Sequence, residues 1–243
     1  MLITVIGRGH SGTRLMSHTL TASGVFMGKP RNLSGDLLPP RDLYDACVIL
    51  ARHVSWRGGM EWDFSRVHAA EIPPGFSRRV LSYLRSVLES PAQLRGWKIP
   101  ETTLAYPWIR RMFPEVRYIF WTRDPRDCII GSHITDDLRD WGVPHQPTDD
   151  VRLQRATSWM YHNELVKSTP RPAHWIEVRY EDFVLHQQET LARLEAFLGF
   201  PLARIPVHRE AIGRWKTDSG KHDFPCFDEA LARYGYARPA RTA

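Results

Sequence analysis

A run of glycine and hydroxyl side chains near the start of the chain has the composition of an anion-binding loop. Residues 7–14 (GRGHSGTR) follow a short apolar run and precede a stretch with helical spacing. Glycines let backbone N–H groups turn toward a ligand, and the N-terminus of the following helix adds a partial positive charge. The segment therefore predicts a cradle for a phosphate or sulfate group.

Two general nucleotide motifs fit this loop incompletely. Gly7, Gly9 and Gly12 satisfy the G-x-G-x-x-G pattern of dinucleotide-binding proteins, but the acid expected about 20 residues later is missing. Arg31 stands near that place, so an NADP site with Arg31 on the extra phosphate is one alternative. Gly7 and Gly12 also fit the phosphate-binding loop of P-loop nucleoside triphosphatases. Thr13 replaces the lysine of that loop, which disfavours phosphoryl transfer.

A third interpretation comes from residues 8–15 (RGHSGTRL). They resemble the 5′-phosphosulfate loop of sulfotransferases, in which a basic residue precedes Ser-Gly-Thr. The resemblance implies that the donor nucleotide binds Arg8, Gly9, His10, Ser11, Gly12, Thr13 and Arg14. His10 takes the place of the family's Lys or Arg near the leaving oxygen.

A second segment, RDPRD at 123–127, follows a strand-like run and is similar to the 3′-phosphate motif of the same family. Arg123 would hold the 3′-phosphate with its guanidinium fork. The family's serine in the next helix corresponds to Gly131, with Ser132 one residue later. That shift rotates a helical side chain by about 100°, so the Gly131 backbone, Ser132 and His133 are alternative contacts.

Two weaker similarities follow. Tyr180-Glu181-Asp182 looks like the family's Tyr-Glu-Asp element, and residues 213–216 (GRWK) look like its C-terminal Gly-x-Trp-Lys loop. The family's upstream Arg-Lys pair corresponds to His208 and Arg209. Its adenine-stacking Trp corresponds to Leu15. The resemblance therefore implies nucleotide contacts from Tyr180, Arg209, Gly213, Arg214, Trp215 and Lys216, with Trp215 or Tyr180 stacking on the adenine.

The implied donor is 3′-phosphoadenosine 5′-phosphosulfate, with adenosine 3′,5′-bisphosphate as product and no metal. Sulfuryl transfer needs a base for the acceptor hydroxyl and a positive group for the leaving oxygen. The resemblance implies a carboxylate after the second strand as the base, which makes Asp36 the first choice. Glu101, with Lys98 nearby, is the second, and His10 is the candidate donor to the leaving oxygen.

The elements that must position these residues alternate in type. Apolar, β-branched runs predict strands at 2–7, 25–28, 97–99, 116–122 and 175–178. Helical spacing predicts helices at 12–23, 43–55, 76–88, 103–113, 125–132, 149–166 and 187–198, the last with Gly199 as its C-cap. Residues 29–41 and 56–74 are the expected loops, which would line an acceptor site.

This pattern predicts an α/β protein with a covered parallel sheet and ligands at the carboxyl ends of its strands. The resemblance, which covers residues 7–216, implies a three-layer α/β/α sulfotransferase fold related to that of P-loop nucleoside triphosphatases. We expect one domain over residues 1–243, frayed after about residue 230.

Charge and composition add few constraints on the ligand and the location of the protein. The net charge of +6 permits a polyanionic ligand but does not identify it. No apolar run approaches about 18 residues, and the strand beginning at Leu2 leaves no room for an export signal. The scattered Cys47, Cys128 and Cys226 suit a reducing compartment.

We therefore expect a cytoplasmic sulfotransferase that modifies a hydroxyl, or an amine, of a small molecule or glycan, with neither nucleic acid nor membrane as partner. The alternatives are an NADP-binding oxidoreductase and a non-catalytic module that binds polyanions or nucleic acid. Neither the acceptor nor the oligomeric state can be inferred from the sequence.

Overall fold

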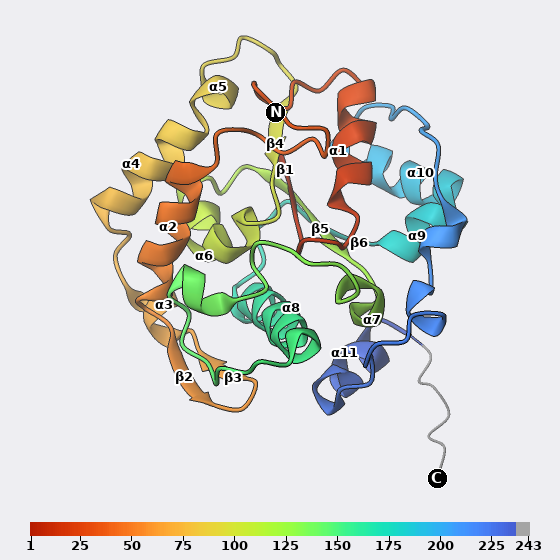
Figure 1. Ribbon diagram of the computed structural model, residues 1–243. Coiled ribbons are helices and arrows are strands. Elements are labelled where there is room, and N and C mark those ends of the chain that lie inside the picture. The colour runs from red at the N-terminus through yellow and green to blue at the C-terminus, as the bar shows by residue number, and fades with distance from the viewer. Residues whose placement is uncertain (237–243) are drawn as a thin grey trace.

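The computed structural model describes residues 1–236, in which strands and helices alternate (Figure 1). The strands are β1 (Leu2–Ile6), β2 (Ser55–Gly58), β3 (Glu61–Asp63), β4 (Arg95–Lys98), β5 (Arg117–Thr122) and β6 (Trp175–Arg179). The α-helices are α1 (Thr13–Ala22), α2 (Arg41–Ala51), α3 (Ser65–Ala69), α4 (Pro74–Tyr83), α5 (Arg85–Leu88), α6 (Thr102–Met112), α7 (Pro125–Cys128), α8 (Val151–Ser168), α9 (Tyr180–Leu185), α10 (Gln187–Leu198) and α11 (Asp228–Arg233). Short 3-10 helices are η1 (Leu138–Trp141), η2 (Arg209–Ala211), η3 (Arg214–Lys216) and η4 (Pro225–Phe227).

Four of the strands form one parallel sheet in the order β4-β1-β5-β6. In the register between β1 and β5, Ile6 lies opposite Phe120. Because parallel strands end at the same edge of a sheet, the loops that follow β1 and β5 start side by side. The two segments predicted to bind anions are therefore neighbours in space.

Side chains alternate along these strands and bury two separate apolar clusters, as expected for a sheet covered on both faces. Ile3, Val5 and Trp121 pack with α1, α9 and α10. Ile6 and Phe120 pack with α2, α4, α6 and α8. Figure 1 shows α1, α9 and α10 on one side of the sheet and α2, α4 and α6 on the other. The predicted three-layer α/β/α arrangement is confirmed.

Local capping explains some helix ends. Helix α8 begins after Asp150, whose side chain accepts hydrogen bonds from the backbone N–H groups of Arg152 and Leu153. Helix α10 ends at Gly199, which has a left-handed conformation (φ 81°). The bounds predicted for α10 are confirmed.

Other predictions are wrong in extent. The strand expected at 25–28 is reduced to one bridge, between Phe26 and Arg95. The helix expected at 43–55 ends at Ala51, and the one expected at 76–88 is divided between α4 and α5. The loop expected at 56–74 contains the β2–β3 hairpin and α3.

The helix expected at 125–132 is only α7, which ends at Cys128. Arg155 of α8 donates hydrogen bonds to the carbonyls of Ile129 (3.2 Å) and Ile130 (2.7 Å). These carbonyls are therefore satisfied without a further helical turn. Gly131 and Ser132 lie beyond the helix, so the rotation argued for them from helical geometry does not apply.

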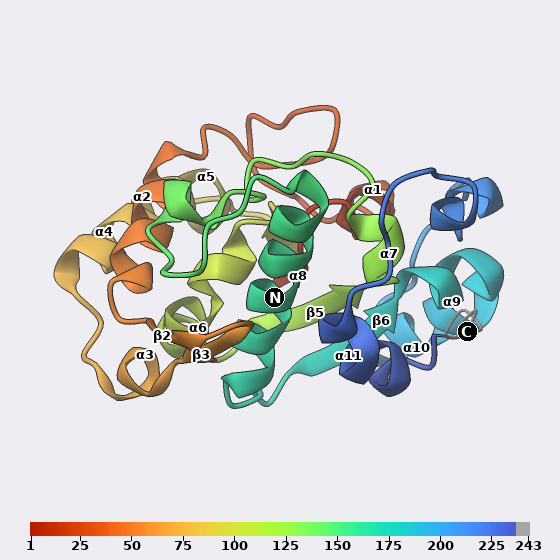
Figure 2. The same cartoon turned by 60° about the horizontal axis from the view of Figure 1, so that its bottom comes forward.

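The end of the chain is packed up to Tyr236, although fraying was expected after about residue 230. Leu231 is buried, and the Tyr236 hydroxyl donates to Glu181 Oε2 (2.9 Å). Residues 237–243, the rest of that tail, lie outside the described residues. Figure 2 shows the segment between α10 and α11 passing beside α7. Within residues 1–236, no helix has the length and apolar character needed to cross a membrane.

Candidate active site

The glycine loop, defined here as residues 7–12, joins β1 to α1 and is fixed by its neighbours. The N–H group of Gly7 donates to Thr103 Oγ1 of α6 (2.8 Å). The indole Nε1 of Trp121 in β5 donates to the carbonyl of Ser11 (3.0 Å). The loop is thus held on both sides of β1 before any ligand arrives.

Two positions in this loop need glycine because other side chains lie against the backbone. A methyl group at Gly9 would overlap the imidazole of His133. A methyl group at Gly12 would overlap the ring of Tyr180, and Gly12 also has a φ of 91°, which disfavours side chains. The glycines predicted to bring the backbone close to a ligand also bring it close to these two rings.

The start of α1 has the groups that an oxyanion requires. Gly12 precedes the ten-residue helix and no side chain caps its first N–H groups. The side chain of Ser11 is buried, and its hydroxyl has no hydrogen-bond partner among residues 1–236. A buried hydroxyl without a partner is costly, and a bound phosphate or sulfate oxygen would satisfy it. These residues fit the predicted 5′-phosphosulfate site.

The side chain of Arg8, which the sequence predicts at that site, is engaged with protein groups. Its buried guanidinium forms an ion pair with Asp136 and donates to the carbonyl of Cys128 (3.0 Å). Arg8 therefore fixes the segment after α7. Arg14 in the first turn of α1 is exposed, and within the described part of the chain no hydrogen bond or ion pair engages its side chain. Arg14 is the cation that remains available at the loop.

His10 is held as a strained, neutral side chain. It has a φ of 63°, and its Nε2 lies 2.6 Å from the carbonyl of Ser132. Loss of water around the ring lowers the pKa of His10, and the nearby Arg8 and Arg123 lower it further. Nε2 therefore donates to Ser132. The ring does not supply the positive charge of the family's Lys or Arg at neutral pH.

Arg123 follows β5 and is turned toward the glycine loop, as expected. Its Nη1 donates to the carbonyl of His10 (3.1 Å), and its Nη2 donates to the carbonyl of Ala211. The guanidinium lies 4.4 Å from the ring centroid of Tyr180. Arg123 is buried, and its Nε has no partner among the described residues. It thus connects the glycine loop to the C-terminal segment.

Gly131 and Ser132, the alternative 3′-phosphate contacts, lie against His10 instead of extending a helix toward Arg123. A methyl group at Gly131 would come within 2.8 Å of the His10 ring. The side chain of Ser132 is exposed, and its carbonyl receives the His10 hydrogen bond.

The C-terminal segment is docked through Asp127. Its Oδ2 accepts from Gly213 N (2.7 Å) and its Oδ1 from Trp215 N (3.0 Å), and the carboxylate is fully buried. The guanidinium of Arg126 lies 3.9 Å from the Trp215 ring centroid. The predicted cationic contacts in this segment are all exposed: Arg209, Arg214 and Lys216. They could meet a nucleotide phosphate beside Arg123.

Adenine stacking on Tyr180 is not supported, because Tyr180 is buried between Arg123 and Gly12. Trp215 is partly exposed, with Arg126 over its ring. Of the two residues proposed for stacking, only Trp215 therefore retains an accessible surface.

The residues proposed for proton transfer meet at the end of β4. Lys98 Nζ donates to Asp36 Oδ1 (2.6 Å) and to the carbonyl of Ser34 (2.7 Å). Asp36 Oδ2 accepts from Asn32 Nδ2 (2.9 Å). Both oxygens of Asp36 are thus engaged, which makes it a poor acceptor for another proton.

Glu101 precedes α6, and its surroundings differ from those of Asp36. Its carboxyl is buried, and burial, together with the smaller effect of the nearby Asp36, raises its pKa to about 7. Oε2 has no hydrogen-bond partner among the described residues, and Oε1 lies 3.7 Å from His133 Nε2. A carboxyl with a pKa near neutrality, one of whose buried oxygens has no hydrogen-bond partner, is suited to general-base catalysis.

Sequence reasoning missed the roles of Asn32, Asp127 and His133. Asn32 holds the Asp36 loop, Asp127 docks the C-terminal segment, and His133 contacts both the glycine loop and Glu101. Asn32 within an Asn-x-x-Gly-Asp run was a possible turn signal. Across residues 1–236, no three His, Cys, Asp or Glu side chains are grouped so that they could hold a metal ion.

The chain is similar in sequence and in fold to known sulfotransferases. Over 174 residues the chain is 24% identical to a putative protein-tyrosine sulfotransferase from Caenorhabditis elegans, which corresponds to 68% of this chain and 64% of that protein. The chain thus spans about 64% of the length of this curated relative.

Two solved structures share the fold. The sulfotransferase domain from the curacin biosynthetic pathway has a TM-score of 0.61 at 15% identity, covering 98% of both chains. The sulfotransferase domain from the Synechococcus PCC 7002 olefin synthase has a TM-score of 0.57 at 14% identity, covering 98% of this chain and 96% of that one. The sequence model of the Sulfotransferase family matches residues 3–204. Because this match runs from β1 to beyond α10, the chain belongs to the sulfotransferase family.

Proposed function

We propose that the protein transfers a sulfuryl group from 3′-phosphoadenosine 5′-phosphosulfate to a hydroxyl, or an amine, of a small-molecule or glycan acceptor. The observation that carries this proposal is the adjacency of the glycine loop after β1 and Arg123 after β5. The two phosphorylated ends of one adenosine need two neighbouring anion sites of this kind.

The glycine loop binds the 5′-phosphosulfate in this proposal. The N–H groups at the start of α1 and the hydroxyl of Ser11 donate to its oxygens, and Arg14 supplies positive charge. Arg123 binds the 3′-phosphate, which competes with the carbonyl of Ala211 for the guanidinium. Arg209, Arg214 and Lys216 add positive charge from the C-terminal segment.

Glu101 serves as the base. When bound, the donor supplies an electrophilic sulfur and a nucleotide leaving group. The acceptor hydroxyl gives its proton to the Glu101 carboxylate while its oxygen bonds to sulfur, and the bond from sulfur to the nucleotide phosphate breaks. The start of α1 and Arg14 stabilise the negative charge on that phosphate. Lys98, held by Asp36, keeps a further cation at this edge of the sheet.

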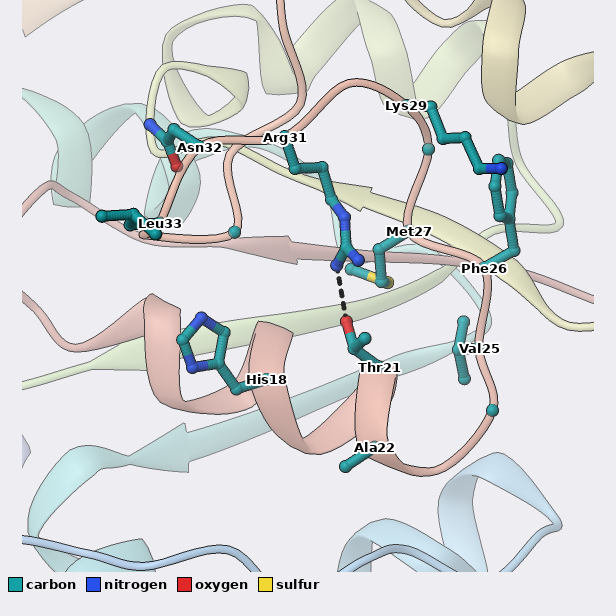
Figure 3. Close-up of a pocket in the computed structure, with 13 residues that line it drawn as sticks. His18, Thr21, Ala22, Val25, Phe26, Met27, Lys29, Arg31, Asn32 and Leu33 are labelled. Carbon is teal, nitrogen blue, oxygen red and sulfur yellow. Dashed lines mark hydrogen bonds between the residues drawn. The ribbon is translucent and has the colours of Figure 1, made fainter.

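The acceptor binds on the side of the 29–41 loop. A cavity of about 910 Å³ lies between α1 and this loop, with His18, Lys29 and Arg31 on its wall (Figure 3). No Asp or Glu occurs among its lining residues, all of which belong to the described part of the chain. Asn32 lines the same cavity and holds Asp36. Lys29 and Arg31 lie toward the end of α1 that is remote from the glycine loop, so this charge favours an acceptor whose anionic group is distant from the hydroxyl that is sulfated.

The position of Arg31 argues against the alternative of an NADP site. Arg31 Nη1 donates to Thr21 Oγ1 (2.6 Å) near the end of α1 (Figure 3). Thr21 is about 12 Å along the helix from its first residue, Thr13, at 1.5 Å per residue. Arg31 is therefore far from the loop that would bind the dinucleotide phosphates.

Ligand-induced stabilisation tests the proposal. Adenosine 3′,5′-bisphosphate is expected to raise the melting temperature at micromolar concentration, and NADP at the same concentration is not. An equal rise with heparin or any polyanion, abolished by moderate salt, would instead support the non-catalytic module.

We also infer a reducing, cytoplasmic location, because Cys47, Cys128 and Cys226 are all free thiols.

A further inference from the structure

The cavity between α1 and the 29–41 loop carries two cations toward the end of α1 that is remote from the glycine loop. Arg31 Nη1 donates to Thr21 Oγ1 (2.6 Å), and Lys29 Nζ lies 5.9 Å from the ring centroid of Phe26. Neither cation pairs with an acidic side chain in the described part of the chain. An anion at this end of the cavity would therefore meet positive charge that no protein carboxylate neutralises.

Much of the remaining wall is apolar. Ala22, Val25, Phe26 and Met27 line the cavity, and so does Leu33, whose side chain is 94% exposed. Figure 3 shows Val25, Phe26 and Met27 on the segment that follows α1. Apolar surface around an open cavity favours a ligand that has an apolar body of its own.

The uncharged polar side chains of the wall already have partners. Thr21 Oγ1 accepts from Arg31 and donates to a backbone carbonyl of its own helix (2.9 Å). Asn32 Nδ2 donates to Asp36, and Asn32 Oδ1 accepts from two backbone N–H groups of the loop. A sugar brings many hydroxyl groups, which need new partners when they leave water. The wall therefore suits an amphipathic acid better than a glycan.

Helix α1 gives the separation between this charge and the glycine loop. Thr21, which holds Arg31, lies eight residues after Thr13, the first residue of the helix. At about 1.5 Å per residue the separation is about 12 Å. Because a carbon–carbon bond is about 1.5 Å long, at least about eight bonds must separate an anion at Arg31 from a hydroxyl at the glycine loop.

We propose that the acceptor is an amphipathic acid, with its hydroxyl at the glycine loop, its apolar body along α1, and a carboxylate, sulfonate or phosphate held by Arg31. The inference rests on the proposed function, since it places sulfuryl transfer at the glycine loop. Lys29 adds positive charge at the anionic end, and His18 lines the cavity from α1 (Figure 3). A molecule of the same length with a cation in place of the anion is disfavoured, and a short acid cannot reach both ends.

Calorimetry with 12-hydroxydodecanoate, in the presence of saturating adenosine 3′,5′-bisphosphate, measures this recognition without turnover. 12-Amino-1-dodecanol is a matched probe of similar length and opposite charge, and 4-hydroxybutanoate is a short acid. We expect 12-hydroxydodecanoate to bind at least about tenfold more tightly than either of these probes.

Substitution of Arg31 identifies the partner of the anion. Arg31→Gln is expected to weaken binding of 12-hydroxydodecanoate by about 5- to 20-fold, and Arg31→Glu to reverse the preference in favour of the amino alcohol. Arg66→Gln, at an exposed position in α3 outside the cavity, is the control and should leave both affinities unchanged.

Four results would overturn the proposal: no binding of 12-hydroxydodecanoate, equal binding of the acid and the amino alcohol, an unchanged affinity in Arg31→Gln, or tighter binding of a uronic-acid disaccharide. The same titrations without nucleotide keep the proposed function separate. If adenosine 3′,5′-bisphosphate does not bind, the sulfotransferase function fails, while the preference for the acid and its dependence on Arg31 are still measured at the cavity.

Discussion

Arg123 Nη1 donates a hydrogen bond to the carbonyl of His10 across 3.1 Å, and this bond joins the ends of two neighbouring strands. The two residues are 113 positions apart in the sequence. The bond is possible because β1 and β5 are paired in parallel, so that the loops after them leave the same edge of the sheet. Substitutions around this edge test how the site is built.

Replacement of Gly9 by alanine should damage the site by contact with His133. The added methyl group overlaps the imidazole, and overpacking of this kind costs about 1–3 kcal/mol of unfolding free energy. Urea denaturation measures this loss. Gly75→Ala in α4 is the control, because the nearest atom is Ile49 Cδ1 at 3.8 Å, and it should be neutral or slightly stabilising. Similar effects of both substitutions would refute the contact with His133.

Asp127→Asn should release the C-terminal segment. The buried carboxylate accepts from Gly213 N and Trp215 N, and a neutral amide weakens at least one of these bonds by about 2 kcal/mol. Hydrogen exchange of residues 209–217 is expected to accelerate at least about tenfold. Asp182→Asn, whose carboxylate is partly exposed and lies 3.7 Å from Arg179, should leave this exchange unchanged.

Glu101→Gln should lower turnover with any acceptor that the enzyme sulfates. Loss of a general base reduces turnover by about 100- to 10,000-fold, while affinity for adenosine 3′,5′-bisphosphate stays within about twofold. Sulfated product measured by mass spectrometry, with calorimetry of the nucleotide, separates the two quantities. Asp36→Asn should have the smaller effect on turnover, because both oxygens of Asp36 are already engaged. The reverse order would make Asp36 the base.

Glu101 should also make stability depend on pH in a definite direction. Its pKa is raised to about 7 in the folded state from an ordinary value of 4.5, so the folded state binds the proton more tightly. The free energy of unfolding is therefore highest below about pH 4.5. It falls by about 3 kcal/mol as the pH rises through 7 and Glu101 in the folded protein loses its proton. Glu101→Gln removes this loss and should be more stable than the unmodified protein at pH 8.

Denaturation at pH 4, 6 and 8 checks that difference. Glu71→Gln is the control, because the Glu71 side chain is exposed and no ion pair engages it within residues 1–236, so its effect on stability should be small at all three pH values. A parallel pH dependence in Glu101→Gln and the unmodified protein would mean that Glu101 is not buried as described.

Local sequence patterns were sufficient for the sheet, most helices and the glycine loop. β-Branched and aromatic runs gave β1, β5 and β6, and Gly199 marked the end of α10. The β2–β3 hairpin was missed, although its Gly58-Gly59 pair is a hairpin-turn signal. The start of α7 was predicted, but its end at Cys128 could not be, because Arg155 of α8 binds the carbonyls after it.

The site residues could likewise be predicted only where local sequence determines their role. The glycine loop and Arg123 were found because their chemistry is contained in short segments. The difference between Asp36 and Glu101 was not accessible, since it depends on Lys98 and Asn32 occupying one carboxylate while burial isolates the other. The ion pair between Arg8 and Asp136 was not accessible for the same reason, because the two residues are distant in sequence.

The central claim is that Arg123 holds the 3′-phosphate of a nucleotide whose 5′ end lies in the glycine loop. Calorimetry of adenosine 3′,5′-bisphosphate and of adenosine 5′-phosphate with the unmodified protein, Arg123→Gln and the exposed-site control Arg66→Gln tests it directly. We predict that Arg123→Gln weakens the bisphosphate by about 10- to 100-fold, changes adenosine 5′-phosphate by less than about threefold, and that Arg66→Gln changes neither. Equal weakening of both nucleotides by Arg123→Gln, or no binding of the bisphosphate to the unmodified protein, would contradict it.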